Sequence, residues 1–288
     1  MKITSVVSTK GGVGKTTVEA NLGALCADAG LRTLLIDLDP AQPSLSSYYQ
    51  LVEEAQGGIY ELLALNATDP LRIISSTTIP NLSLVISNDV NNQLNTLLLQ
   101  APDGRLRLAN LMPTFVDHFD LVLIDTQGAR SVTLETALLC SDLAISPITP
   151  DMLAAREFYR GTQQLLKDLA PLASLGVYTP PLNIVINKLD ATNDANLIYQ
   201  SLVETLADHP QINLLQTTIP AAVSFRRAAT EGVPAHRLEY RQPHNRRSPA
   251  AFAVMKALAS ELFPEWRALF NKLAHDTLGT PADEELAS

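Results

Sequence analysis

The sequence predicts an α/β fold, in which a single domain is built on a mostly parallel, twisted sheet with helices on both faces. Strand-like and helix-like segments alternate along nearly the whole chain, which is the pattern of successive β-α-β units. The composition agrees with this class, because 46% of the 288 residues are hydrophobic and only 5% are aromatic. A chain of this length can bury one substantial core.

The elements follow from short apolar runs and from apolar residues at helical intervals. The runs predict strands at Ile3–Ser8, Thr33–Leu38, Leu82–Ser87, Leu121–Asp125, Leu143–Ile148 and Leu182–Asn187. The helical spacing predicts helices at Thr16–Ala29, Arg105–His118, Val132–Ser141, Leu153–Leu169, Ala195–Asp208, Ala221–Thr230 and Pro249–Leu262. We expect one domain over residues 1–276 and a flexible acidic tail over residues 277–288.

A glycine-rich segment lies between the first predicted strand and the first predicted helix. Its glycines allow backbone N–H groups to converge on a polyphosphate at a helix N-terminus, where the helix dipole also favours negative charge. This context predicts a phosphate-binding P-loop formed by Gly11, Gly12, Val13, Gly14, Lys15, Thr16 and Thr17. Lys15 would reach the β- and γ-phosphates, and the Thr16 hydroxyl would ligate Mg²⁺.

Another lysine, Lys10, opens the same motif. The complete string from Lys10 to Thr17 resembles the deviant P-loop of the ParA/MinD family of ATPases. The resemblance implies a P-loop NTPase fold and a homodimer that encloses two ATP molecules. It also implies that Lys10 crosses the dimer interface to the partner's nucleotide. A cation supplied in trans would act there much as an arginine finger does.

Two further predicted strands end in carboxylates. Asp37 and Asp39 are two residues apart, so they point the same way from the C-terminal end of a buried strand, where ligands bind in open parallel sheets. The segment resembles the family's D-x-D-P motif, which implies that Asp37 supports the P-loop and the Mg²⁺ shell. By the same resemblance, Asp39 orients or deprotonates the attacking water. Asp125 ends a Walker B strand, whose carboxylate usually holds Mg²⁺ through water.

The loops after these two strands depart from the common family pattern. Many relatives have D-x-P-P-S where this chain has Thr126-Gln127-Gly128-Ala129-Arg130 after Asp125. Similar D-T-x-G segments occur among ParA-like proteins of conjugative elements. Gly128 should keep the loop mobile, as a switch segment that senses the γ-phosphate requires. The sequence D-P-A-Q-P-S replaces the usual D-P-Q-G-N, which leaves the role of Gln42 open.

The segment Ile184–Asp190 ends in N-K-x-D, which resembles the guanine signature of GTPases. The overlapping segment Leu189–Asn193 instead resembles the F-D-A-R-T-N stretch of chromosomal ParA proteins, which use ATP. The second resemblance favours ATP, with GTP as the alternative. It implies that Asn187 contacts an adenine edge and that Pro220 packs on the base.

The chain carries a net charge of −9, which argues against attraction of the whole molecule to nucleic acid. Basic residues nevertheless gather near the C-terminus, where a local surface can bind a phosphate backbone. This region resembles the one through which family members bind DNA without sequence preference. The resemblance implies DNA contacts by Arg226, Arg227, Arg246 and Arg247. A solvated charged face or intramolecular ion pairs are the alternative.

Several other classes of protein are not expected. Cys26 and Cys140 are too few for a disulfide framework and lack metal-site spacing, so buried thiols in a reducing cytoplasm are expected. There is no apolar stretch long enough to span a membrane, and no signal peptide or N-terminal helix-turn-helix is apparent. The segment Glu265–Leu273 has helical amphipathic spacing, but an acidic tail follows it. We therefore expect it to pack against the domain.

The resemblance covers residues 1 to about 262 and implies a short ParA-type partition ATPase, cytoplasmic and associated with the nucleoid. The ATP-bound dimer would bind double-stranded DNA non-specifically. Slow hydrolysis, stimulated by a ParB-like centromere-binding partner, would release it. The alternatives are a ParA-like ATPase that positions a conjugation complex or other cargo, a MinD-like membrane ATPase and a metabolic P-loop enzyme. The sequence does not identify the partner or the cargo.

Overall fold

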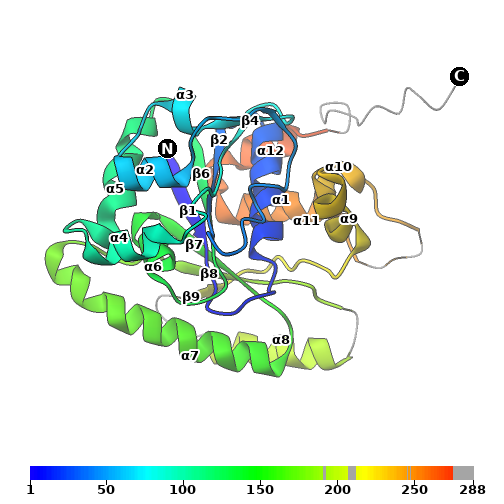
Figure 1. Cartoon of the computed structure of the whole chain (residues 1–288). Helices are drawn as coiled ribbons and strands as arrows, with labels where there is room; N and C mark the ends of the chain where they lie inside the picture. The colour runs from blue at the N-terminus through cyan, green and yellow to red at the C-terminus, as the bar shows by residue number, and fades with distance from the viewer. Residues whose placement is uncertain (191–192, 207–211, 245, 247, 275–288) are drawn as a thin grey trace, which may run out of the picture.

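The computed structural model describes residues 1–190, 193–206, 212–244, 246 and 248–274. These residues form one α/β domain around a single sheet (Figure 1). Within the described ranges the sheet has nine strands in the order β3-β4-β5-β2-β6-β1-β7-β8-β9. The predicted fold class is confirmed. The predicted acidic tail lies outside the described residues, so its boundary stays a prediction.

All six predicted strands are present and pair in parallel with their neighbours. They are β1 (Lys2–Val6), β2 (Thr33–Leu38), β5 (Leu82–Val85), β6 (Leu121–Thr126), β7 (Leu143–Ile148) and β8 (Leu182–Ile186). The sequence missed three short strands, which are β3 (Leu51–Glu53), β4 (Ser75–Thr77) and β9 (Ile212–Leu214). Strands β3 and β4 extend one edge of the sheet in antiparallel fashion.

Helices cover both faces of the sheet. One face carries α1 (Lys15–Asp28), α11 (Ala251–Leu262) and α12 (Arg267–Lys272). The other carries α2 (Ile59–Leu65), α4 (Gln93–Gln100), α5 (Arg107–Leu111), α6 (Val132–Cys140), α7 (Met152–Leu169) and α8 (Asn193–Leu206). Three further helices are α3 (Pro70–Ile73), α9 (Val223–Glu231) and α10 (Ala235–Leu238).

The predicted helix Arg105–His118 is wrong as one continuous element. It divides into the 3₁₀ turn Gly104–Leu106, helix α5 and a second 3₁₀ turn, Met112–Phe115. Pro113 lies in that second turn and has no N–H to continue an α-helical hydrogen-bond ladder.

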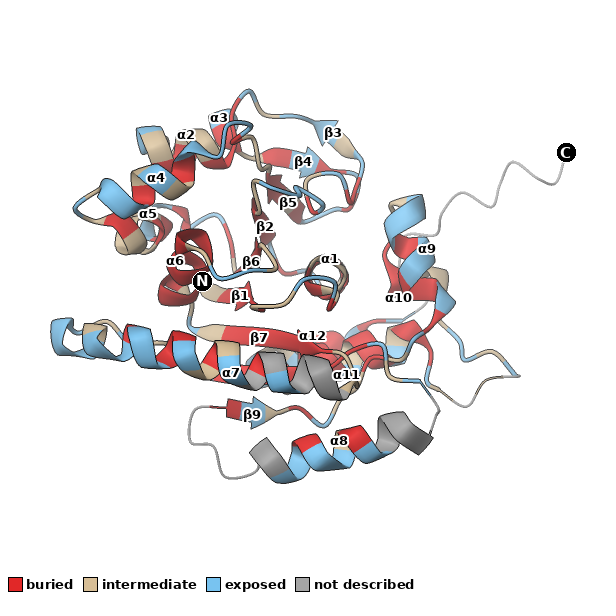
Figure 2. Cartoon of the chain, turned by 60° about the horizontal axis from the view of Figure 1, so that its bottom comes forward, coloured by how far each residue is buried: buried red, intermediate tan, exposed pale blue. Residues whose placement is uncertain are grey.

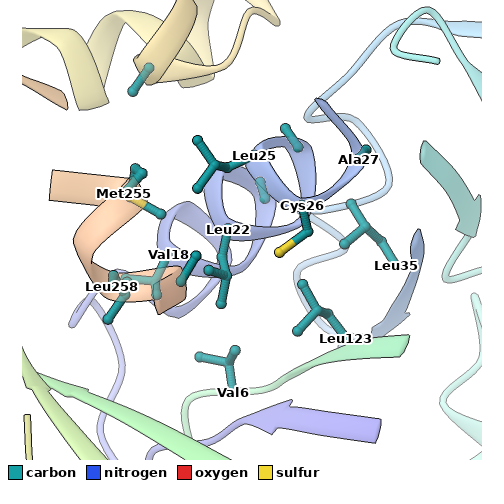
Figure 3. Close-up of a cluster of buried hydrophobic side chains, with 14 of the residues drawn as sticks. Val6, Val18, Leu22, Leu25, Cys26, Ala27, Leu35, Leu123, Met255 and Leu258 are labelled. Atoms are coloured by element: carbon teal, nitrogen blue, oxygen red, sulfur yellow. The ribbon is translucent and has the colours of Figure 1, made fainter. Parts of the chain in front are cut away.

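Helix α1 is enclosed by the rest of the domain. Leu22 and Cys26 face the sheet, where they meet Leu35 and Leu123, while Met255 of α11 packs from the other side (Figure 3). The helix therefore has little polar face, and its position beside the strand ends is fixed by packing. Figure 2 shows that the central strands are buried, whereas the outer helix α7 alternates between buried and exposed residues.

The amphipathic C-terminal segment packs on the domain, as expected from the sequence. Phe270 is fully buried and Leu273 is nearly so, in the cluster that contains α1. Trp266 packs against Phe263, with their ring centroids 5.4 Å apart. In the described part of the chain, no helix combines the length and apolar character that a membrane span requires.

Candidate functional site

The P-loop joins β1 to α1 in a conformation that requires glycine. Gly12 and Gly14 have φ angles of 77° and 89°, in the left-handed region that other residues rarely adopt. A Cβ atom on Gly14 would lie 2.3 Å from Nδ2 of Asn187. Gly14 is also the N-cap of α1, and no side chain caps the helix there. The first N–H groups of α1 are therefore available to an anion.

A cavity of about 700 Å³ opens above the P-loop. This volume is typical of a small-molecule site. It is lined by the P-loop, by the loop after β2, by the loop after β6 and by Ala229 of α9. The lining residues are Gly11, Gly12, Gly14, Lys15, Thr16, Thr17, Asp39, Ala41, Gln42, Ser44, Ser47, Tyr48, Gln127, Gly128, Ala129 and Ala229.

The three predicted metal residues come together beneath this cavity. Asp37 and Asp125 are direct neighbours in the register of β2 and β6. The Thr16 hydroxyl donates a hydrogen bond of 2.5 Å to Oδ2 of Asp125. Asp37 accepts hydrogen bonds from the backbone N–H and the hydroxyl of Ser46, at 2.8 and 2.7 Å. The ends of β2 and β6 and the start of α1 therefore bring together the three residues that the sequence predicted as metal ligands.

These carboxyl groups lie in an environment that disfavours negative charge. Burial raises the pKa of Asp125 to about 7, against a hydrogen bond from Thr16 that lowers it. Burial likewise raises the pKa of Asp37 to about 6. A third acid, Glu19 on α1, is fully buried, and neither of its oxygens has a hydrogen-bond partner in the described structure. Burial and the nearby Asp125 and Asp37 raise its pKa well above the usual value.

The donor set fits a magnesium ion. Hydroxyl and carboxylate oxygens are the ligands that Mg²⁺ prefers, and it commonly retains waters and substrate phosphates as its other ligands. In the described part of the chain, no group of three or more His, Cys, Asp or Glu side chains is arranged to hold a metal by itself. A cation here would therefore depend on Thr16, Asp125, Asp37 and oxygens brought by the ligand. It would also offset the uncompensated charge of the buried acids.

Asp39 lies at the wall of the cavity, as its predicted role requires. Its Oδ1 atom accepts hydrogen bonds from the backbone N–H groups of Ala41 and Gln42, at 3.1 and 3.0 Å. These bonds hold the loop after β2 in a tight turn. The role of Asp39 toward an attacking water stays a prediction.

The two lysines of the motif occupy different positions. Lys15 is nearly buried and lines the cavity. Lys10 carries its ammonium 3.9 Å from a carboxylate oxygen of Asp151, in the segment after β7. The backbone N–H of Lys10 donates to the hydroxyl of Ser8. Its predicted reach across a dimer interface concerns a second chain and stays a prediction.

The segment after β8 supports the P-loop, which the sequence did not indicate. The amide of Asn187 donates a 2.8 Å hydrogen bond to the carbonyl of Val13. The ammonium of Lys188 donates another of 2.8 Å to the carbonyl of Gly12. Lys188 adopts a positive φ angle of 57°, which is unusual for a residue with a side chain. Pro220 forms a bridge with Leu189 next to them. The predicted adenine contacts of Asn187 and Pro220 stay predictions.

Two of the predicted DNA-contacting arginines pair with acidic residues in the described part of the chain, and the DNA contacts themselves stay predictions. Arg227 is exposed and pairs with Glu231 at 2.7 Å. Arg246 forms an ion pair with Glu239 through both terminal nitrogens of its guanidinium group. Arg226 is exposed on α9. Arg247 lies outside the described residues. For Arg227 and Arg246 the structure shows the intramolecular pairing that the sequence left as an alternative.

Comparison with known families agrees with this architecture. A family model described as an AAA domain, AAA_31, matches residues 1–175, which is more than half of the chain. The chain belongs to this family. It is similar to the sporulation initiation inhibitor protein Soj of Bacillus subtilis (strain 168), with 26% identity over 235 residues, covering 81% of this chain and 89% of Soj.

Two solved structures have the same fold. The ATP complex of a variant of McdA from Cyanothece superposes with a TM-score of 0.72 at 20% identity, covering 98% of this chain and 97% of that one. A putative plasmid partition protein of Borrelia burgdorferi B31 bound to AMPPNP gives a TM-score of 0.65 at 23% identity, covering 92% and 98%. The family match and the similarity to Soj confirm the resemblance of the motif to the ParA/MinD family.

Proposed function

We propose that this ParA/MinD-type protein binds and slowly hydrolyses ATP with Mg²⁺. The proposal depends mainly on the cavity above the P-loop. Lys15 and Thr16 line it, and the buried Asp37 and Asp125 lie next to them at the ends of β2 and β6. The solved neighbours with ATP and AMPPNP support adenine over guanine as the base. The N-K-x-D segment, whose Asn187 and Lys188 contact the P-loop, keeps GTP as the competitor to test.

Each residue of the site has a part in this chemistry. The P-loop N–H groups and Lys15 bind the β- and γ-phosphates. Thr16, Asp125 and Asp37 would hold Mg²⁺, and the ion would neutralise charge on the phosphate oxygens. Asp39 accepts a proton from the attacking water at the cavity wall.

We further propose a nucleotide-driven switch between monomer and dimer. In the ATP state two protomers pair, and Lys10 leaves Asp151 to reach the partner's phosphates. The paired molecule binds double-stranded DNA without sequence preference, in the cytoplasm and on the nucleoid, until hydrolysis separates the protomers. A ParB-like centromere-binding partner stimulates that step. Membrane association is not part of the proposal, because α12 buries its apolar residues in the domain.

A second candidate is a ParA-like ATPase that positions a conjugation complex or other cargo. Two observations favour it. The Thr126-Gln127-Gly128 loop departs from the partition pattern. Two of the arginines predicted to bind DNA are also neutralised within the chain, by Glu231 and Glu239. Recovery of a relaxase instead of a centromere-binding protein in a pull-down would favour this candidate.

The test of the main proposal compares nucleotide states. Full-length protein is assayed for binding to random-sequence duplex DNA with ATP, with ADP, with GTP and without nucleotide. We expect binding to be tightest with ATP and to weaken steeply with salt. Lys15→Ala and Thr16→Ala should abolish nucleotide binding, because they remove the phosphate and Mg²⁺ contacts. Unchanged ATP affinity in these variants would contradict the P-loop assignment, and equal DNA binding in all states would contradict the switch.

A further inference from the structure

The loop between β6 and α6 is pressed against the start of the P-loop. A Cβ atom on Gly128 would lie 2.6 Å from the Cα of Gly11 and 3.3 Å from the carbonyl oxygen of Lys10. The two backbones are therefore in direct contact, and only glycine fits at position 128. The two residues that flank Gly128, Gln127 and Ala129, both line the cavity above the P-loop.

Both ends of this loop are anchored. At its beginning, the Thr126 hydroxyl donates a 2.9 Å hydrogen bond to the carbonyl of Val6 in the neighbouring strand. At its end, Arg130 pairs with Glu135 of α6 at 3.1 Å and with Asp168 of α7 at 2.5 Å. The structure holds the loop at both ends, which restricts its middle, and the mobility that the sequence predicted there stays a prediction.

Gln127 is the polar residue of this loop that lines the cavity. It is half-buried and lines the same cavity as Lys15 and Asp39. In the described residues its carboxamide has no hydrogen-bond partner, although it can donate two hydrogen bonds and accept two. The carboxamide is therefore a polar group of the cavity that the fold itself does not use.

We propose that Gln127 is a catalytic residue that orients the attacking water in ATP hydrolysis, which rests on the function proposed above. Its carboxamide oxygen accepts one proton of the water in a hydrogen bond, while its NH₂ group donates to an oxygen of the γ-phosphate. The water oxygen then attacks the γ-phosphorus, and the bond from that phosphorus to the β–γ bridging oxygen breaks. The other proton of the water passes to the carboxylate of Asp39. The products are ADP and inorganic phosphate.

Asp39 and Gln127 have different roles because their side chains offer different hydrogen-bonding groups. One oxygen of Asp39 is already engaged by the N–H groups of Ala41 and Gln42. A carboxylate in that position accepts protons only, so it cannot also bond to a phosphate oxygen. The carboxamide of Gln127 provides an acceptor for the water and a donor for the γ-phosphate. One side chain can therefore hold the water beside the phosphorus that it attacks. Correct alignment of reacting atoms accounts for a large part of catalysis in phosphoryl transfer.

The experiment compares full-length wild type with Gln127→Ala and Gln127→Glu under single-turnover conditions with Mg²⁺ and ATP. We expect hydrolysis to slow about 10²-fold in both variants, because each lacks the donor. ATP affinity of Gln127→Ala, measured with a fluorescent analogue, should stay close to the wild-type value, because the bond to the γ-phosphate strengthens only as the water attacks. Affinity for ADP with aluminium fluoride, which mimics the transferring phosphoryl group, should fall in parallel with the rate. Gln100→Ala, on α4 and outside the cavity lining, is the matched control and should hydrolyse ATP normally.

Three results would overturn the inference. The first is wild-type hydrolysis in Gln127→Ala, and the second is loss of hydrolysis in Gln42→Ala with full activity in Gln127→Ala. The third is loss of ATP affinity in Gln127→Ala, because that would mean a structural role. DNA binding in the ATP state separates this inference from the proposed function. If wild type hydrolyses ATP through Gln127 but never binds DNA, the inference stands and the partition function fails.

Discussion

Replacement of Asp125 by asparagine should stabilise the nucleotide-free protein at neutral and alkaline pH while weakening its response to Mg²⁺. The Asp125 side chain is only 2% exposed, and burial raises its pKa from 3.8 to about 7. The folded state therefore holds a proton that the unfolded chain releases between about pH 4 and pH 7. Stability is lost as the pH rises through this window, because ionisation is more costly in the folded state.

The size of the effect follows from the two pKa values. At ~1.4 kcal/mol per pKa unit, the penalty is on the order of 4 kcal/mol at pH 8 and less than half of that at pH 5. Asparagine has the same shape and never ionises. Its oxygen can accept the bond from the N–H of Thr126, and its NH₂ group can donate to the Thr16 hydroxyl. We therefore expect Asp125→Asn to gain roughly 8 °C in Tm at pH 8 and less at pH 5.

The assay is thermal and urea denaturation of wild type and Asp125→Asn at both pH values, with and without Mg²⁺ and ATP. Adding Mg²⁺ to the ATP-containing samples should stabilise wild type more than Asp125→Asn, because the variant lacks one of the metal-binding carboxylates. Asp103→Asn is a control of opposite sign, because Arg107 lowers the pKa of Asp103 and the substitution should cost stability above about pH 4. Equal stability of wild type and Asp125→Asn at pH 8, or a gain that does not depend on pH, would refute this account of the buried carboxyl.

Three further outcomes test the contacts around the P-loop and the basic region. Gly14→Ala should abolish ATP binding, since its Cβ would meet the amide of Asn187 at 2.3 Å and φ is 89°; calorimetry checks this, and normal affinity would contradict it. Lys188→Met should weaken ATP binding about tenfold at unchanged Tm, because one charged hydrogen bond to the P-loop is lost; equal affinity would exclude that role. Arg226→Ala should lower the salt slope of DNA binding by about one unit. Arg246→Ala should instead lower the Tm with little change in that slope, because it breaks the ion pair with Glu239. The reverse pattern would mean that the DNA-binding surface includes Arg246 and not Arg226.

The sequence predicted the parts of the fold that carry long periodic signals. Strands β2 and β6 are uniformly buried runs, so both their existence and their carboxylate ends were visible. Strands β3, β4 and β9 have three residues each, which is too short to show alternation. Their pairing is decided by tertiary contacts, and single-sequence patterns do not contain these.

The residues of the site were predicted, but several of their contacts were not. A signature such as N-K-x-D indicates a strand end near a nucleotide. It does not indicate that Asn187 and Lys188 direct their donors to the carbonyls of the P-loop. In the same way, a cluster of arginines predicts positive charge, while Glu239, seven residues before Arg246, neutralises part of it. Such pairings depend on distances between side chains, and composition does not determine them.

The burial of Glu19 was not predicted from the sequence, and it affects ligand binding at the P-loop. In the sequence it is an ordinary polar residue of a helix, but α1 has no solvent face there and both carboxyl oxygens are left without partners in the described structure. Asp37 and Asp125 are close enough to raise its pKa further, so the free protein holds three buried acids with Lys15 as the nearby cation. A bound cation relieves this repulsion in the folded chain only. Binding at the P-loop should therefore be coupled to the stability of the whole domain, because a ligand that favours the folded state shifts the folding equilibrium.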